Sequence, residues 1–443
     1  MTVRLPELEP RGPSVRVPPG RSVRLTPRFR DLIDAPAVQR LRSVRQLGPT
    51  AWVYPGATHS RFEHSLGVFG RMQDALVHLL ASPFVAASLS EADLLAGLCA
   101  ALLHDVGHYP FAHSLEALHR RGRDTPRHEA LSASLIRGPL AAHIAAIGAE
   151  PERVAALVAL PHSRQATAVD GLLAHLLSGG VDVDKLDYLE RDSTHLGVPY
   201  GLGFDVQRLL EALVVVNDRL GVAASGRLSA EMFVFARYAM FSEVYWHHAV
   251  RAAAAMVEAA LAALPPEPLG ALERQLLSLG DDTFLAAVRA SAPEGGTTAR
   301  LLDHLAARRL YKRIATFSRA YAEPEKQAAW RLLYEADRDT LDRVSLGIAA
   351  ALGGEPGDVL IDTPPRDKDH PEPITIVYGP HVTGRREVPL HELSGVVQGV
   401  STDFVKVVKK VRVFAAPSLV VGADRQALHA LVVETVQRHG SCT

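Results

Sequence analysis

Apolar residues recur at spacings of three and four along most of the chain, which is the pattern of helices that bury one face. This pattern runs from residue 31 to about residue 256, and a further helical run extends from about residue 271 to residue 352. One clear apolar stripe consists of Leu94, Leu95, Leu98, Ala101 and Leu102. Residue types that favour helices dominate both stretches. The pattern therefore predicts a mainly α-helical fold.

The pattern changes after the glycine pair at residues 353 and 354. Residues 359–362 and 374–378 are rich in β-forming residues, and residues 407–416 alternate in part between polar and apolar, as strands do. Residues 423–438 predict a closing helix. We therefore expect four parts: an extended arm at residues 1–30, a helical catalytic domain at 31–265, a helical extension at 266–352 and a small C-terminal α+β unit at 353–443.

The N-terminal segment is rich in proline and arginine. Prolines at positions 6, 10, 13, 18 and 19 prevent a regular helix, which is why we expect an extended arm. Residues 1–45 contain ten arginines and four acidic residues. Two interpretations remain open for this basic surface: a solvated face, or a docking surface for a phosphorylated effector.

Composition excludes several classes of protein. The 443 residues carry a net charge of −1, whereas proteins that coat nucleic acid without sequence preference are usually much more basic. Two cysteines are too few for a disulfide framework. The N-terminus has no apolar core of the signal-peptide type, and no stretch reaches about 18 uninterrupted apolar residues. We therefore expect a cytoplasmic protein without a membrane span.

Histidines and carboxylates gather in four segments: HSRFEHS at residues 59–65, HDVGHYPFAHSLE at 104–116, RHE at 127–129 and VDVDKLDYLERD at 181–192. The doublet His104–Asp105 ends an apolar helical run, where an unsatisfied polar pair would cost several kcal/mol. A site that mixes imidazole and carboxylate donors suits Mn, Fe or Zn, and it tolerates Mg. Any one of these histidines alone is more often structural, but the combination is specific.

These motifs resemble the HD superfamily of metal-dependent phosphohydrolases, and within it the dNTP triphosphohydrolase branch. The resemblance extends from DAPAVQRLRSVRQLG at residue 34 through YPGATHSRFEHSLGV, LLHDVGHYPFAHSLE and VDVDKLDYLERDSTHLGV to EVYWHHAV, and IDTPPRDKDHPEPITIVY fits bacterial members. We expect no sterile-alpha-motif domain before it. The resemblance implies an HD-domain helical core within the mainly α fold.

The resemblance also implies the reacting centre. It implies the metal ligands His64, His104, Asp105 and Asp184. It implies a phosphate site lined by His108, His113 and His128, with Glu116 orienting His113 or His128. His113 is the candidate general acid for the leaving 5′-oxygen. Glu116 stands where the family has an aspartate, so the carboxylate is kept with a longer reach.

Substrate contacts follow from the same resemblance. The triphosphate would be bound by Arg61, Lys185, Tyr188 and Arg237. The sugar would be selected by Gln46, Leu47, Asp192 and Tyr245. In this set Gln46 and Asp192 would bind the 3′-hydroxyl, while Leu47 and Tyr245 would crowd the 2′ position. For Tyr245, aromatic core packing is an equally open interpretation.

Family members are often homo-oligomers activated by a guanine nucleotide. The positions of the guanine-reading residues are held here by Asp34, Gln39 and Arg42, and GTP or dGTP would be the activator. The same motif also serves as helix packing, and VPPGRSV at residues 17–23 replaces a segment that relatives contribute to the effector site. Both interpretations stay open, and so does the choice between dimer and tetramer.

We expect hydrolysis of dNTP to deoxynucleoside and inorganic triphosphate, in nucleotide pool control or phage defence. A P-loop enzyme is disfavoured because the chain has no G-x-x-x-x-G-K-[ST] motif. Two alternatives remain. One is an HD phosphohydrolase for another phosphorylated nucleotide, and the other is a nucleotide-sensing or nucleic-acid-binding scaffold.

Overall fold

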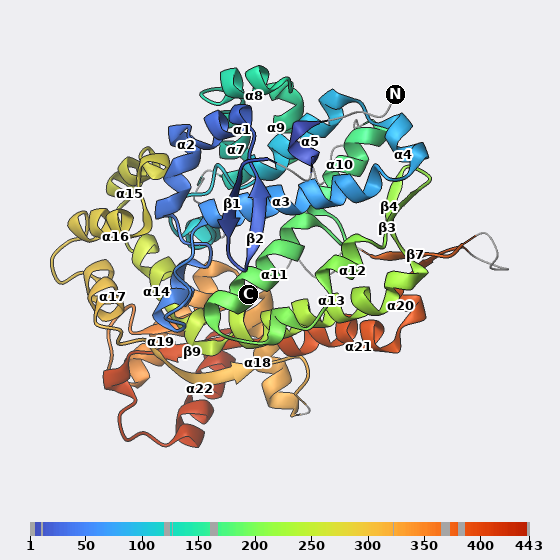
Figure 1. The fold of residues 1–443 in the computed structure, drawn as a ribbon. Coiled ribbons are helices and arrows are strands. Elements are labelled where there is room, and N and C mark those ends of the chain that lie inside the picture. The colour runs from blue at the N-terminus through green and yellow to red at the C-terminus, as the bar shows by residue number, and fades with distance from the viewer. Residues whose placement is uncertain are drawn as a thin grey trace.

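The computed structural model describes residues 5–9, 12–118, 125, 127–159, 167–321, 323–364, 373–379 and 386–440. Helices predominate in these residues, and the strands form three small sheets, so the expected mainly α fold is confirmed (Figure 1). The helices of the first half are α1 Pro27–Ile33, α2 Pro36–Gln39, α3 Arg61–Leu79, α4 Pro83–Ser88, α5 Glu91–Leu103, α6 Ala112–Glu116, α7 His128–Arg137, α8 Ala141–Ile147, α9 Pro151–Ala159, α10 Ala168–Ser178, α11 Val183–Leu196 and α12 Val206–Leu210.

The second half adds further helices and most of the strands. The helices are α13 Arg227–Met240, α14 His248–Ala262, α15 Pro266–Glu273, α16 Asp281–Ala290, α17 Thr297–Ala306, α18 Pro324–Glu335, α19 Arg338–Ala351, α20 Leu390–Leu393, α21 Gly395–Asp403 and α22 Arg425–Gly440. The strands of the whole chain are β1 Ser14–Val17, β2 Arg21–Arg24, β3 Leu213–Val216, β4 Arg219–Ala223, β5 Lys312–Phe317, β6 Val359–Asp362, β7 Thr375–Val377, β8 Glu387–Pro389 and β9 Val411–Ala415.

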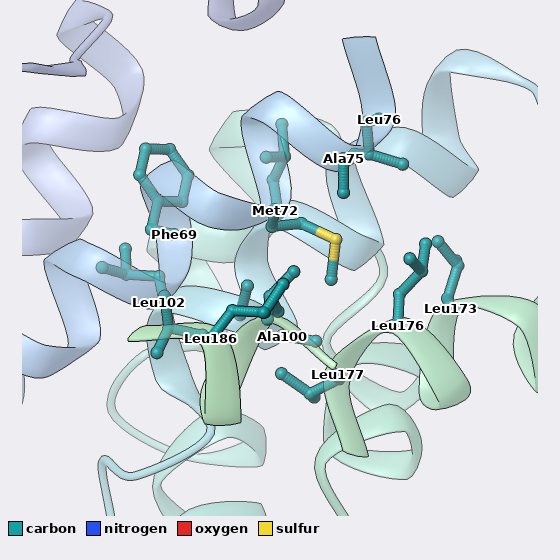
Figure 2. Close-up of a cluster of buried hydrophobic side chains, with 14 of the residues drawn as sticks. Phe69, Met72, Ala75, Leu76, Ala100, Leu102, Leu173, Leu176, Leu177 and Leu186 are labelled. Carbon is teal, nitrogen blue, oxygen red and sulfur yellow. The ribbon is translucent and has the colours of Figure 1, made fainter. Parts of the chain in front are cut away.

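Helix α3 is enclosed on nearly all sides, because α5 and α11 both pack against it. Figure 2 shows the apolar interface that joins α3 to α5, α10 and α11. Its labelled side chains are Phe69, Met72, Ala75, Leu76, Ala100, Leu102, Leu173, Leu176, Leu177 and Leu186. Burial of one large apolar side chain contributes about 1.5–3 kcal/mol. This packing fixes the three helices whose ends carry the predicted metal ligands.

Side-chain caps set where these three helices begin. The Ser60 hydroxyl accepts from the backbone N–H of Glu63 at the start of α3. Ser90 and Asp93 form a capping box at the start of α5. Asp182 caps α11 by accepting from the backbone N–H of Lys185. Since each cap satisfies backbone donors that the helix leaves unpaired, it fixes the register of the residues that follow.

The N-terminal segment differs from the expected extended arm. β1 and β2 form an antiparallel hairpin in which Val15 pairs with Val23. Val17 and Val23 are buried, and Val23 lies against Gly70 of α3. The alternation of valine with arginine or serine on both sides of the proline pair is a strand pattern, which the proline content obscured. The hairpin therefore belongs to the core.

The C-terminal strands join sheets that reach outside residues 353–443. β5, from the segment expected to be helical, pairs with β9, which pairs in turn with β6. β7 and β8 extend the hairpin formed by β3 and β4. Strand pairing across the chain thus connects the C-terminal part to earlier segments. Residues 365–372 of the motif IDTPPRDKDHPEPITIVY lie outside the described residues.

Among the described helices, none combines the length and the apolar character that a membrane crossing requires. In two sharply bent helix pairs, at residues 128–147 and 248–273, the two helices of a pair have the required length and apolar character only when they are joined into one segment.

A buried carboxylate anchors the N-terminal segment. The Glu7 side chain is fully enclosed, and its two oxygens accept from Arg28 Nε and Nη2, both at 2.8 Å, and from the Thr26 hydroxyl at 2.6 Å. Gln73 of α3 donates to the Glu7 carbonyl at 3.1 Å. Burial alone would raise the pKa of the Glu7 carboxyl, but the bonds from Arg28 and Thr26 outweigh it and lower this pKa below its ordinary value.

Replacing Glu7 by glutamine should destabilise the fold by about 2 kcal/mol at pH 7, since charge-assisted hydrogen bonds are lost. Because the folded pKa lies below the unfolded one, the stabilisation is present above about pH 4.5 and is lost as the pH falls through the folded pKa. Urea denaturation at pH 7 and pH 4 measures the difference, which should shrink at pH 4. In the control Glu152→Gln, which breaks an exposed pair with Arg137, the change should be much smaller. An equal loss of stability in both variants would contradict the stabilising role of the buried Glu7 carboxylate.

Candidate metal centre and nucleotide site

The four predicted metal ligands come together at the ends of three helices. His64 lies in the first turn of α3, His104 and Asp105 follow the end of α5, and Asp184 lies in the first turn of α11. Nε2 of His64 is 3.0 Å from Oδ1 of Asp184. Nε2 of His104 is 3.5 Å from Oδ1 of Asp105 and 3.8 Å from Oδ1 of Asp184. The donor atoms of His64, His104 and Asp105 all lie within 4.8 Å of one another.

The two imidazoles are held in the tautomer that a metal needs. Nδ1 of His64 donates to Oδ2 of Asp187 at 2.9 Å, and Nδ1 of His104 donates to the Ala101 carbonyl at 3.0 Å. Nε2 of His104 therefore carries a free lone pair, whereas Nε2 of His64, 3.0 Å from Asp184, shares a proton with that carboxylate and would release it to bind a metal. Nε2 of His104 is buried and has no hydrogen-bond partner among the described residues. A divalent cation would satisfy it, so the donor set fits a metal.

The electrostatics also favour a cation. Burial opposes protonation of His64, but its hydrogen bonds with Asp184 and Asp187 outweigh burial and raise its pKa to about 10. Burial would raise the pKa of Asp105, yet His108, His104 and Arg61 hold it well below the ordinary value. Donors bound at about 2.1 Å to one ion lie roughly 3 Å apart, which is close to the spacings here. The ionised carboxylates can take a divalent ion with little rearrangement.

The predicted phosphate-site residues form a second group beside this centre. Glu116 accepts from Nδ1 of His128 at 2.6 Å, and its other oxygen lies 3.4 Å from Nδ1 of His113. The rings of His108 and His128 are 3.8 Å apart, and Nδ1 of His108 lies 3.1 Å from Asp105. Burial, with Arg61 nearby, keeps the pKa of His108 well below its ordinary value. The His113 side chain is 71% exposed, which leaves it accessible to a substrate.

Most of the predicted triphosphate contacts have internal partners. Arg61 donates to Asp105 at 2.6 Å, and Lys185 bonds Asp182 and the Gly179 carbonyl. Arg237 has a buried Nε without a partner among the described residues, and the same is true of the Nε of Arg61. Burial raises the pKa of the Tyr188 phenol to about 12, although the positive charge of Arg237 acts to lower it. The charge of Arg237 therefore acts on the Tyr188 hydroxyl.

The predicted sugar contacts centre on Asp192. Its two oxygens accept from Nε2 of His59 at 2.8 Å and from the Tyr245 hydroxyl at 2.6 Å. Burial and the Asp192 charge raise the pKa of Tyr245 well above its ordinary value, so the phenol stays a donor. Gln46 donates its backbone N–H to the His59 carbonyl, and its side-chain oxygen is buried without a partner in the described part of the chain. Leu47, which follows, is half-buried at the start of a short 3₁₀ turn.

Two of the three predicted effector residues, Gln39 and Arg42, contact each other. Asp34 is exposed at the end of α1. The Gln39 amide donates to the Ile33 carbonyl at 2.9 Å and accepts from Arg42 at 2.7 Å. The Arg42 guanidinium lies 3.8 Å above the ring of Phe62. These contacts stabilise the turn itself, and the effector role stays a prediction.

Two supporting residues were missed by sequence reasoning. Asp187 holds the predicted metal ligand His64, and His59 holds Asp192. Both lie inside motifs that stood out in the sequence, in HSRFEHS and in VDVDKLDYLERD. A carboxylate three residues after Asp184 was the available signal for Asp187, since metal-bound histidines usually donate to such a group.

Metal removal and replacement test the donor set. Metal-free protein should bind one Mn²⁺ per chain, and its melting temperature should rise by a few degrees, because a ligand of the folded state alone stabilises that state. His104→Ala should abolish both effects, whereas His175→Ala, at an exposed position of α10, should keep them. Calorimetric titration and thermal unfolding supply the two measurements. Unchanged Mn²⁺ binding by His104→Ala would refute the donor set.

Comparisons with known proteins identify the family of this chain. Residues 61–192 match the HD domain family, and residues 204–440 match the family described as the HD associated region. The uncharacterized protein YwfO of Bacillus subtilis is 33% identical over 228 residues, covering 50% of this chain and 49% of that protein. Human deoxynucleoside triphosphate triphosphohydrolase SAMHD1 is 32% identical over 230 residues, which cover 46% of this chain and 36% of the human protein.

The chain spans about half the length of the curated relatives that it matches. A solved structure from Bacteroides thetaiotaomicron, titled a phosphohydrolase, shares the fold with a TM-score of 0.68 at 24% identity, covering 91% of this chain and 100% of that one. The HD associated region alone accounts for more than half of the chain. The protein therefore belongs to the family that carries the HD associated region, within the HD phosphohydrolase superfamily.

Proposed function

We propose that the protein is a metal-dependent dNTP triphosphohydrolase, which hydrolyses dNTP to deoxynucleoside and inorganic triphosphate. The observation that carries the proposal is the convergence of His64, His104, Asp105 and Asp184 on one point. The similarity to SAMHD1, named for this activity, supports the choice of substrate. A divalent ion held there would supply a Lewis acid for the phosphoryl group and would lower the pKa of bound water.

The histidine group beside the metal centre would supply the proton that the leaving oxygen needs. A water molecule attacks the α-phosphorus and loses a proton, the bond from phosphorus to the 5′-oxygen breaks, and His113 donates a proton to the leaving oxygen. The proton lost by the water restores the one that His113 gives, so no net proton is consumed. Glu116, 3.4 Å from Nδ1 of His113, orients that ring so that Nε2 is free to reach the substrate. His108 and His128 line the same place and would donate to phosphate oxygens.

Cations would hold the triphosphate. Arg237 already has a buried nitrogen without a protein partner among the described residues, so an anion would restore a hydrogen bond there. Lys185 would exchange its bond to the Gly179 carbonyl for a phosphate oxygen, and Tyr188 would add its hydroxyl. Arg61 would use the donors that its bond to Asp105 leaves free.

The sugar site would read the 3′-hydroxyl and exclude a 2′-hydroxyl. Asp192 is fixed by His59 and Tyr245, and Gln46 offers an unsatisfied side-chain oxygen. The Tyr245 ring and Leu47 would fill the space at C2′. Activation by GTP or dGTP at Asp34, Gln39 and Arg42, and assembly into a homo-oligomer, belong to the same proposal.

Product analysis with the four dNTPs, in Mn²⁺ or Mg²⁺, tests the reaction. We expect deoxynucleoside and inorganic triphosphate in equal amounts, because attack at the α-phosphorus releases all three phosphates together. The activity of Asp105→Asn, in which one proposed ligand loses its negative charge, should fall to background. That result would exclude a contaminating enzyme as the source of the products. Release of pyrophosphate or single phosphate, or turnover of monophosphates alone, would contradict the proposal.

The Tyr245 ring should set the preference for deoxyribose. In Tyr245→Ala the ratio of kcat/KM for dATP over ATP should fall by at least about tenfold, since steric exclusion at one group is worth about 1–3 kcal/mol. Tyr245→Phe keeps the ring and loses the hydrogen bond to Asp192, so it should keep this ratio. Steady-state kinetics of both variants provide the measurement. An unchanged ratio in Tyr245→Ala would assign the discrimination to another residue.

A further inference from the structure

Arg191 is the largest fully buried side chain among the described residues. It lies in α11, one helical turn after Asp187. Its guanidinium binds Asp187 through two parallel bonds of 2.8 Å, from Nε to Oδ2 and from Nη2 to Oδ1. Such a fork fixes the plane of a carboxylate, which a single bond does not.

The third guanidinium nitrogen reaches two other parts of the fold. Nη1 donates to Oε1 of Glu63 at 2.7 Å and to the Pro18 carbonyl at 2.5 Å. Glu63 precedes His64 on α3, and Pro18 lies in the turn of the N-terminal hairpin. One buried cation therefore ties α11, α3 and the hairpin together. These bonds hold Arg191 in place from the side opposite to Asp187.

Asp187 passes this constraint to the metal centre. Its Oδ2 atom accepts both from Arg191 and from Nδ1 of His64, at 2.8 and 2.9 Å. The carboxylate is 1% exposed, so water does not compete for it. Fixed in this way, Asp187 keeps the His64 ring in one orientation with Nε2 toward Asp184.

Helix α3 leaves room for the Asp187–Arg191 pair because position 67 is a glycine. A Cβ atom added at Gly67 of α3 would overlap both the Asp187 carboxylate and the Arg191 guanidinium. Glycine within a helix costs about 1 kcal/mol relative to alanine, so its presence here has a steric reason. The space above Gly67 is occupied by the bidentate pair.

We propose that Arg191 is a positioning residue for the metal centre, acting through Asp187 on His64. The inference rests on the proposed metal-dependent function. Lysine at this position would keep a buried positive charge but would lose the fork, so Asp187 could turn and His64 with it. Metal affinity, rather than the fold, should then be the quantity that changes most.

Arg71 offers a matched control. It is a buried arginine on α3 that binds Glu190 on α11, so it joins the same two helices as Arg191. Nη2 of Arg71 donates to the Glu190 carboxylate, whereas Asp187 accepts from Arg191 and His64. Arg71→Lys therefore perturbs the same interface without releasing the carboxylate that holds His64.

The experiment is a Co²⁺ titration of the metal-free 443-residue chain, followed by the visible absorption of the bound ion. Arg191→Lys should bind Co²⁺ about tenfold more weakly and with altered bands, as expected when a group that supports a ligand is disturbed. Arg71→Lys should bind within twofold of the unsubstituted protein. Gly67→Ala, which displaces the pair while both charges stay, should also weaken binding about tenfold.

The outcomes separate this inference from the proposed function. If the unsubstituted protein binds no Co²⁺, the metal-dependent function fails. If it binds Co²⁺ and Arg191→Lys binds equally well with the same spectrum, Arg191 has no positioning role. Should Arg191→Lys fail to fold, Gly67→Ala decides, and unchanged affinity in that variant overturns the inference.

Discussion

The structure depends on one constraint: two imidazoles and several carboxylates, some fully buried and some partly exposed, are held against one another in a helical domain. His64 lies 3.0 Å from Asp184 and 2.9 Å from Asp187, and Nε2 of His104 is buried beside them without a partner among the described residues. Such a group is costly to bury unless a cation or a proton balances it. The surrounding elements serve to hold it, and a divalent ion would neutralise it.

Apolar packing and helix caps hold these side chains in position. α3, α5, α10 and α11 share one core, so the ends of three helices meet at fixed positions (Figure 2). The caps at Ser60 and Asp182 place His64 and Asp184 in first turns, and α5 ends at His104. The ligands therefore sit on rigid elements, whereas His113, which would have to meet a moving substrate, is exposed.

Helix periodicity is a local signal, and it was sufficient for the helical character. The set of four donors came from the resemblance to the HD superfamily, because no local pattern joins His64 and His104 to Asp184. The sequence was insufficient where a role comes from contacts between distant segments. The bond of Arg191 to Pro18 and that of His59 to Asp192 each join residues more than a hundred positions apart. Likewise, the proline-rich start obscured a hairpin, and β5 became a strand because β9 is its partner.

Anomalous diffraction at the manganese absorption edge, from crystals of the protein grown with Mn²⁺, tests the central claim most directly. The account predicts one dominant peak, bounded by Nε2 of His64 and His104 and by the carboxylates of Asp105 and Asp184. A dominant peak elsewhere, or an ordered site with these four side chains and no peak between them, would contradict it.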